Sequence, residues 1–181
     1  IFFSVRYAME FKIGDNIVCG GNGVCQIDDI KDISFFHEQP QKYYVLKPLF
    51  VKQAAVVYVP FENKAQVSRI QPVLSKKEAI ALIDALPIKT GAWIEDRNER
   101  KEMFSDIVAN GAREEILGLI NLINTKASEL SKDGKHLNAQ DERVLADAKN
   151  RINNEFAVAL EIEPDGVYEM IHEKTGIEDF A

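Results

Sequence analysis

This 181-residue sequence lacks an excess of positive charge. It contains 22 lysines and arginines against 29 aspartates and glutamates, which gives a net charge of −7. A protein that coats nucleic acid without discrimination needs a broad positive surface, so that class is excluded. The acidic excess is uneven, since residues 161–181 carry seven acidic side chains and one basic side chain. Any contact with nucleic acid must therefore come from a local patch.

Cysteines, histidines and long apolar runs are also scarce. The two cysteines, Cys19 and Cys25, lack the CxxC spacing of a metal site and are too few for a disulfide framework. We read them as small strand or turn residues of a protein in a reducing, cytoplasmic environment. The three histidines stand in separate segments, so no metal site is predicted. No apolar run reaches the length of a membrane span.

The motifs of the common enzyme classes are missing as well. The sequence contains no phosphate-binding loop, no dinucleotide fingerprint, no His-Glu-x-x-His and no nucleophile elbow. The glycine-rich residues 20–23 are followed by neither a Lys-Ser/Thr pair nor a helical pattern, so they predict a tight turn between strands. We therefore predict a non-enzymatic protein that needs no cofactor.

The first part of the chain has the pattern of short strands. Residues 1–8 form an apolar leader without a signal-peptide cleavage site, and we place the start of the first domain at Met9. After it, β-branched and aromatic runs alternate with turn residues. Five short strands in so few residues predict a small antiparallel β-barrel. The expected strands cover residues 16–19, 24–33, 43–46, 54–59 and 67–70.

From residue 74 onward the apolar spacing changes from two residues to 3.6, which indicates helices. Ser75 and Glu78 have the spacing of a capping box, and Asn138 is a second candidate cap. The fold class predicted is α+β in two segregated domains, the barrel followed by a helical bundle. The predicted domains are the barrel over residues 9–73, the helical domain over 74–161 and an acidic C-terminal extension over 162–181.

The single tryptophan, Trp93, lies in a stretch predicted to be helical from Thr90 onward. At 3.6 residues per turn, one helix face would carry an indole next to three cations. On such a surface the cations can contact the phosphates of a nucleic acid, and the indole can insert between its bases. A partly buried core anchor with a local cation–π pair gives the same pattern. The exposure of the indole distinguishes the two interpretations. The expected face consists of Trp93, Arg97, Arg100, Lys101 and Phe104.

Three further blocks stand in order along the chain: residues 11–18 (FKIGDNIV), residues 44–47 (YVLK) with 57–63 (VYVPFEN), and residues 137–149 (LNAQDERVLADAK). Together with Trp93 and the cations after it, they resemble the CarD/CdnL family of bacterial transcription regulators. The resemblance covers residues 9–161, and the order and spacing of the blocks make it specific.

This resemblance implies a Tudor-like RNA-polymerase-interaction domain, shared with transcription-repair coupling factor, followed by a helical DNA-binding domain. It implies binding to the polymerase β-subunit and to the upstream edge of the melted promoter, where a tryptophan wedges into the minor groove. The wedge position falls on Trp93. With the further cations of the helical half included, the predicted DNA-binding residues are Trp93, Arg97, Arg100, Lys101, Lys89 and Arg143.

The polymerase-binding positions are predicted around the fourth strand, where Tyr58 stands in place of an arginine by which the family often grips polymerase. They are Tyr58, Pro60, Glu62 and Asn63. The predicted function is that of a monomeric, non-enzymatic regulator that stabilises the open promoter complex. Two alternatives stay open: a protein-interaction module whose helical domain only packs, and a DNA-repair adaptor that uses the domain shared with the coupling factor.

Overall fold

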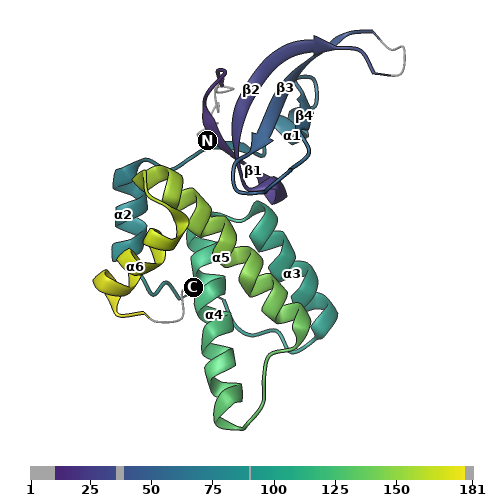
Figure 1. Cartoon of the computed structure of the whole chain (residues 1–181). Helices are drawn as coiled ribbons and strands as arrows, with labels where there is room; N and C mark the ends of the chain where they lie inside the picture. The colour runs from purple at the N-terminus through teal and green to yellow at the C-terminus, as the bar shows by residue number, and fades with distance from the viewer. Residues whose placement is uncertain (1–10, 36–38, 90, 178–181) are drawn as a thin grey trace, which may run out of the picture. The chain divides into compact units, whose positions relative to one another are not determined.

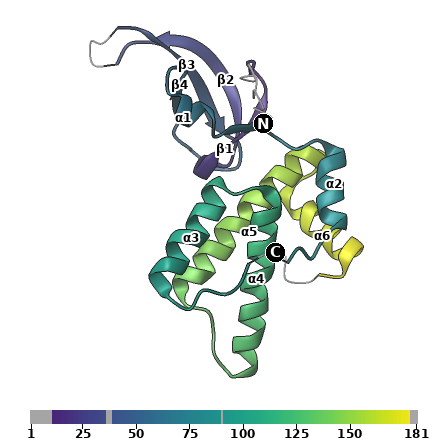
Figure 2. The same cartoon turned by 180° about the vertical axis from the view of Figure 1, so that it is seen from behind.

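The computed structural model describes residues 11–35, 39–89 and 91–177. They form two compact units, which meet in sequence between Pro72 and Val73. The first unit contains the strands and the second contains the longer helices (Figures 1 and 2). The change of apolar period in the sequence falls at this boundary.

The N-terminal unit is built on one five-stranded sheet in the order β4-β3-β2-β1-β5. Every neighbouring pair is antiparallel. The predicted α+β class is confirmed, but closure into a barrel is not seen, because β4 and β5 are the two edges of the sheet and do not pair within the described residues. The strands are β1 (Asn16–Cys19), β2 (Val24–Ile33), β3 (Gln41–Pro48), β4 (Val57–Pro60) and β5 (Ile70–Pro72).

The end of this unit differs from the strand pattern predicted for it. β4 begins at Val57, and the residues after it form a short helix, α1 (Lys64–Val67), before β5 begins. Helix α1 starts where it does because the Asn63 side chain accepts a hydrogen bond from the backbone N–H of Gln66 at 3.1 Å. The predicted strands over 54–59 and 67–70 are therefore too early in the chain.

The main core of this unit lies on the sheet face that carries Tyr44 and Leu46, while Val45 between them is buried on the other face. Tyr44 and Leu46 of β3 are buried, and Leu46 lies opposite the buried Ile27 of β2. Phe61 stacks on the Tyr44 ring at a centroid distance of 4.1 Å. The predicted tight turn between β1 and β2 is confirmed as the short 3₁₀ turn η1 (Gly20–Asn22), and Gly23 follows it at φ 67°, a conformation that favours glycine.

In the C-terminal unit, α5 is the central helix and packs against each of the helices α2, α3, α4 and α6 (Figure 1). None of the helices in the described residues is long and apolar enough to cross a membrane. The helices are α2 (Lys76–Asp84), α3 (Arg97–Asn110), α4 (Arg113–Lys132), α5 (Ala139–Leu160) and α6 (Pro164–Thr175).

Helix ends in this unit follow from local capping. The predicted capping box at Ser75 is confirmed, since its side chain and that of Glu78 each bond the other's backbone N–H. Asn138 caps α5 as predicted. Thr90 lies outside the described residues, and α3 begins only after Asp96, whose carboxylate accepts bonds from the N–H groups of Asn98 and Glu99 at 2.9 Å each.

One buried carboxylate ties the start of this unit to its central helix. Glu155 of α5 is 1 % exposed and accepts a hydrogen bond from the backbone N–H of Leu74 at 3.1 Å. It also forms an ion pair with Arg113 of α4 at 2.8 Å. These contacts fix the backbone immediately before α2 and the start of α4 to the same point on α5.

The C-terminal residues, predicted as an acidic extension, pack inside the helical unit instead. Helix α6 buries Val167 and Ile171 completely in the main core, next to Phe156 of α5. Its acidic side chains face outward, as in Glu169 and Glu173. Charge counting predicted an extension because it overlooks the apolar stripe at i and i+4 that covers the bundle.

Candidate functional site

Trp93 lies in an irregular segment, residues 91–95, immediately before α3. The indole is half-buried at the edge of a small core formed by α3, α4 and α5. The Phe104 ring meets it edge-on at 5.9 Å. The guanidinium carbon of Arg100 lies 4.6 Å from the ring centroid, and the Lys126 ammonium lies 5.5 Å from it. An aromatic ring in contact with two cations is the central feature of this site.

The predicted single helical face is wrong in its geometry. Trp93 precedes the helix, because Asp96 caps α3 and turns the chain before Arg97. Arg97 and Lys101 lie one turn apart on α3 and are exposed, as predicted. Phe104 is not part of a surface, because only 2 % of it is exposed.

Arg100 differs most from its predicted role, because it is buried and 4 % exposed. Its Nε and Nη2 atoms donate to both carboxylate oxygens of Asp141, at 3.1 and 3.0 Å. Its Nη1 atom donates to the backbone carbonyls of Ile94 and Glu95. A guanidinium occupied in this way cannot meet a phosphate without breaking a buried ion pair, so its position clamps the Trp93 segment to α3 and α5.

Lys126 of α4 was not among the predicted site residues. Its ammonium group lies over the indole, and it pairs with Glu129 of the same helix at 3.6 Å. No local pattern links Lys126 to Trp93, since the two are far apart in sequence and meet only through the packing of α4 beside the 91–95 segment. With the exposed Arg97 and Lys101, the partly exposed Lys126 takes the place that the sequence had assigned to Arg100.

The two further cations predicted for this surface are both exposed, and neither is among the cations found over the indole. Lys89 is in the connection between α2 and α3. Arg143 lies on α5 and is 4.0 Å from Asp147, which partly neutralises it. In the described part of the chain, the cations placed over the Trp93 ring are Arg100 and Lys126.

A second candidate surface lies on the sheet of the N-terminal unit, on the face opposite its core. Three aromatic rings meet there edge-to-face: Phe35 after β2, Tyr43 of β3 and Tyr58 of β4, with centroid distances of 5.4 to 6.5 Å. Tyr58 is 42 % exposed and Phe35 38 %. Exposed aromatic clusters of this kind are typical of protein-binding surfaces. We call these three residues the aromatic cluster.

The other predicted polymerase-binding positions adjoin this cluster along the edge strand. Pro60 lies opposite Tyr43 in the β3–β4 pairing, and Glu62 is exposed just beyond the strand. Asn63 is already engaged as the cap of α1, so its side chain has a structural function. Phe35 and Tyr43 were not among the predicted binding residues. Their positions, just after one strand and at the start of the next, could have indicated that the two rings lie close together.

The cysteines belong to the core of the N-terminal unit. Burial, together with a smaller contribution from the nearby Cys19, raises the pKa of the Cys25 thiol to about 12. A thiol with such a pKa is neither a nucleophile nor a metal ligand near neutral pH. In the residues that the structure describes, no group of three or more potential ligands could hold a metal ion.

Comparison with known proteins assigns the first unit. Residues 11–73 match the family model of the CarD-like/TRCF RID domain. No curated protein sequence matches the chain significantly. The N-terminal unit is therefore an RNA-polymerase-interacting domain of a transcription-related class. The match covers the N-terminal unit alone, so the CarD-like/TRCF RID assignment applies to residues 11–73.

Proposed function

We propose that this protein is a non-enzymatic transcription regulator that binds the RNA-polymerase β-subunit with its N-terminal unit and promoter DNA with its helical unit. The observation that carries the proposal is the match of residues 11–73 to the polymerase-interacting domain. The DNA contact rests on Trp93 and the accessible cations Arg97, Lys101 and Lys126. In this proposal the surface meets the upstream fork of the melted promoter and stabilises the open complex.

The polymerase-binding surface that we propose is the edge strand β4 with the aromatic cluster. β4 has one unpaired side in the described sheet, which offers backbone groups to a partner strand. Tyr58 lies on this strand and combines a large apolar ring with a polar end, a residue type enriched among binding hot spots. Glu62 and Pro60 border the same edge.

The DNA contact that we propose is weak on its own. The formal charge of the helical unit is negative, so the proposed contact is limited to the three cations Arg97, Lys101 and Lys126 together with the Trp93 ring. If all three neutralise phosphates, the logarithm of the binding constant falls with the logarithm of salt concentration with a slope of roughly −2.7. Tethering through polymerase then supplies the high effective concentration that function needs.

Stabilisation of the open complex follows from selective binding. A protein that contacts DNA only after the fork has melted shifts the equilibrium toward the melted state. If the protein binds the melted state more tightly than the closed state by about 1.4 kcal/mol, on the order of one good contact, the equilibrium between the two states shifts about tenfold. The ring need not be freely exposed for this effect, since a half-buried indole still presents an edge.

The experiment for the polymerase contact measures affinity of the full chain for the isolated β-subunit. We expect Tyr58→Ser to weaken binding about tenfold or more, as at interface hot spots. Ile13→Ser is the matched control, because Ile13 is a 60 % exposed apolar residue of the same unit outside the aromatic cluster. Equal affinities of the two variants, or loss of binding only with changes in the helical unit, would contradict the proposal.

The experiment for the DNA contact measures the lifetime of open promoter complexes with the full chain present. Lys101→Gln and Lys126→Gln should each shorten the lifetime and reduce the salt slope of binding to forked DNA by about 0.9. Lys77→Gln, at an exposed position of α2, is the control with the same loss of charge. If all three variants behave alike, the patch around Trp93 is not the DNA-binding surface.

One observation favours a second candidate, a protein-interaction module whose helical unit does not touch DNA. Trp93 is only half-exposed, and Arg100 and Lys126 lie over its ring, as expected for a packed side chain. This candidate predicts normal β-subunit binding together with no effect of Lys101→Gln and Lys126→Gln on promoter complexes.

A further inference from the structure

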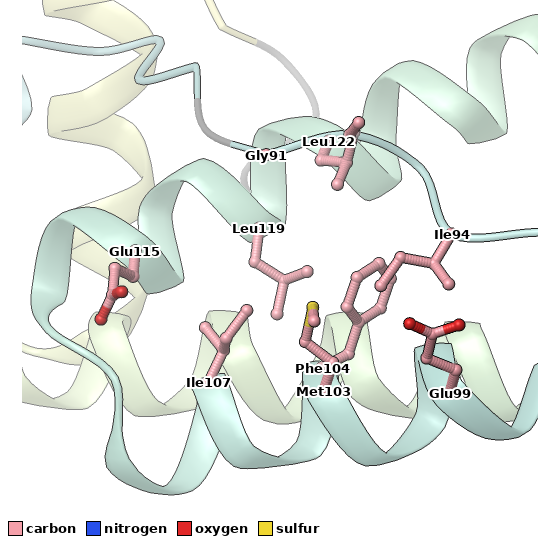
Figure 3. A pocket seen from close by; sticks show the side chains of 10 residues that line it. Gly91, Ile94, Glu99, Met103, Phe104, Ile107, Glu115, Leu119 and Leu122 are labelled. Atoms are coloured by element: carbon pink, nitrogen blue, oxygen red, sulfur yellow. The ribbon is translucent and has the colours of Figure 1, made fainter.

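A hollow of about 400 Å³ lies on the helical unit between α3, α4 and the irregular segment before α3. Its side chains converge from three elements, so it is a formed depression and not a gap along one helix (Figure 3). The larger apolar side chains that line it are Ile94, Met103, Phe104, Ile107, Leu119 and Leu122.

Two carboxylates border this pocket at opposite ends. Glu99 lies on the first turn of α3 and Glu115 on the first turn of α4, with the apolar side chains between them (Figure 3). Both are exposed, and neither forms an ion pair within the described residues. Glu115 accepts one hydrogen bond, from the backbone N–H of Ala112. The ends of the pocket are therefore negative and available to a partner.

Among the large apolar side chains of the lining, Met103 is the exposed one, at 49 %. An unbranched methionine adapts its shape to different partners and is frequent on surfaces that bind peptides. A single exposed apolar residue is ordinary on a protein surface. Met103 is informative because it also lines an apolar hollow, where a partner's side chain could contact it.

Two of the three cations proposed for DNA, Arg97 and Lys101, lie away from this pocket, whereas Lys126 follows the lining residue Leu122 by one helical turn. Residues two positions apart on a helix are roughly 160° apart around its axis, so Lys101 lies far around α3 from both Glu99 and Met103. In the irregular segment, Ile94 lines the pocket while the neighbouring Trp93 contacts Arg100 and Lys126. A ligand in the pocket leaves Lys101 uncovered.

We propose that this pocket binds a short segment of a partner protein in which an apolar side chain lies between two lysine or arginine side chains. The apolar floor takes the central side chain, and the two carboxylates take the flanking cations. This interaction is additional to the polymerase and DNA contacts proposed above and does not depend on them.

The positions of the carboxylates set the spacing of the cations. From Glu99 to Ile107, α3 rises roughly 12 Å at 1.5 Å per residue, and Glu115 lies beyond Ile107 (Figure 3). An extended chain covers about 13 Å in four residues. The simplest matching segment is therefore Lys-x-apolar-x-Lys in an extended conformation.

The test uses the full chain with methyl-labelled methionine and the blocked pentapeptide Lys-Ser-Leu-Ser-Lys as probe. The Met103 methyl signal, assigned by its loss in Met103→Leu, should shift saturably on titration. The Met170 signal should stay unchanged, because Met170 lies on α6 outside the pocket. Peptides with serine in place of leucine, or glutamate in place of both lysines, should bind at least about fivefold more weakly.

Protein variants then separate charge recognition from simple apolar binding. Glu99→Gln combined with Glu115→Gln should weaken binding of the lysine peptide about three- to tenfold, the range expected for two exposed ion pairs. Glu102→Gln combined with Glu114→Gln is the matched control, since it removes the same charge from the same helices outside the pocket. This control should leave the affinity within about twofold.

Three results would overturn the proposal. The Met103 signal could fail to shift with any peptide, which would mean that the pocket binds no such segment. The two double variants could weaken binding equally, which would assign the effect to overall charge. Tighter binding of an uncharged apolar small molecule such as indole, unaffected by the Glu99 and Glu115 changes, would make the pocket a small-molecule site.

Discussion

Replacing Asp141 by alanine tests the clamp that holds the Trp93 segment. The substitution leaves the Arg100 guanidinium buried without its counter-ion, since both side chains of this pair are only 5 % exposed. Breaking a buried pair by removing one partner costs about 3–5 kcal/mol, because the remaining charge has lost its hydration. Asp141 also accepts a hydrogen bond from the Asn138 side chain at 2.6 Å, which is lost as well.

A loss of this size is a large share of the free energy of unfolding, which for a domain is about 5–15 kcal/mol. For a unit of this length, each kcal/mol lowers the melting temperature by about 4 °C, so the expected fall is roughly 12–20 °C. The measurement is thermal unfolding of the full chain, followed by helical circular dichroism. Emission of the single tryptophan reports the clamp directly, because Arg100 lies against its ring.

The control is Asp147→Ala, which removes the surface pair with Arg143 and should change stability by less than about 0.5 kcal/mol. A second variant, Arg100→Met combined with Asp141→Ala, removes both charges and should recover most of the loss. If Asp141→Ala alone costs less than about 1 kcal/mol, or if removing both charges is worse than removing one, the clamp interpretation is wrong.

Three further predictions address other parts of the molecule. Trp93→Ala should lower the unfolding free energy by about 2 kcal/mol in chemical denaturation, near half the cost of removing a fully buried tryptophan, and an unchanged midpoint would contradict its packing. Because the pKa of Cys25 is raised in the folded state, the folded protein keeps a neutral thiol at a pH where the unfolded thiol, with its pKa near 9.0, has ionised. The free energy of unfolding should therefore fall between pH 9 and about 12. Cys25→Ala should lack that part of the fall. Ser75→Ala should cost about 1 kcal/mol through loss of the α2 cap, measurable against Ser128→Ala on an exposed position of α4.

Much of the helical unit was predictable because its boundaries are encoded locally. Ser75 and Asn138 cap their helices as the sequence indicates. The start of α3 was missed although its signal is present: Asp96 followed three residues later by Glu99 is a common helix-start pattern. The apolar spacing of Trp93 and Ile94 resembled one more helical turn, and that periodicity was given more weight than the cap.

The site could be predicted only in part because its geometry depends on contacts between distant residues. Arginine is rarely buried, so Arg100 was expected on the surface, and nothing near it in sequence identifies Asp141 as its partner. Lys126 reaches Trp93 only through helix packing. Strand patterns likewise predict strands but not whether the outer two pair, so the open sheet could not be distinguished from a barrel.

The buried pair between Arg100 and Asp141 also determines how this protein can be re-engineered. The segment that carries Trp93 has no regular structure of its own, and its backbone carbonyls at Ile94 and Glu95 are held by the Arg100 guanidinium. A graft of residues 91–104 into another helical scaffold would therefore deliver the indole without its orientation. A transplantable module must include the first turns of α5, so that Asp141 moves with the segment that it helps to hold.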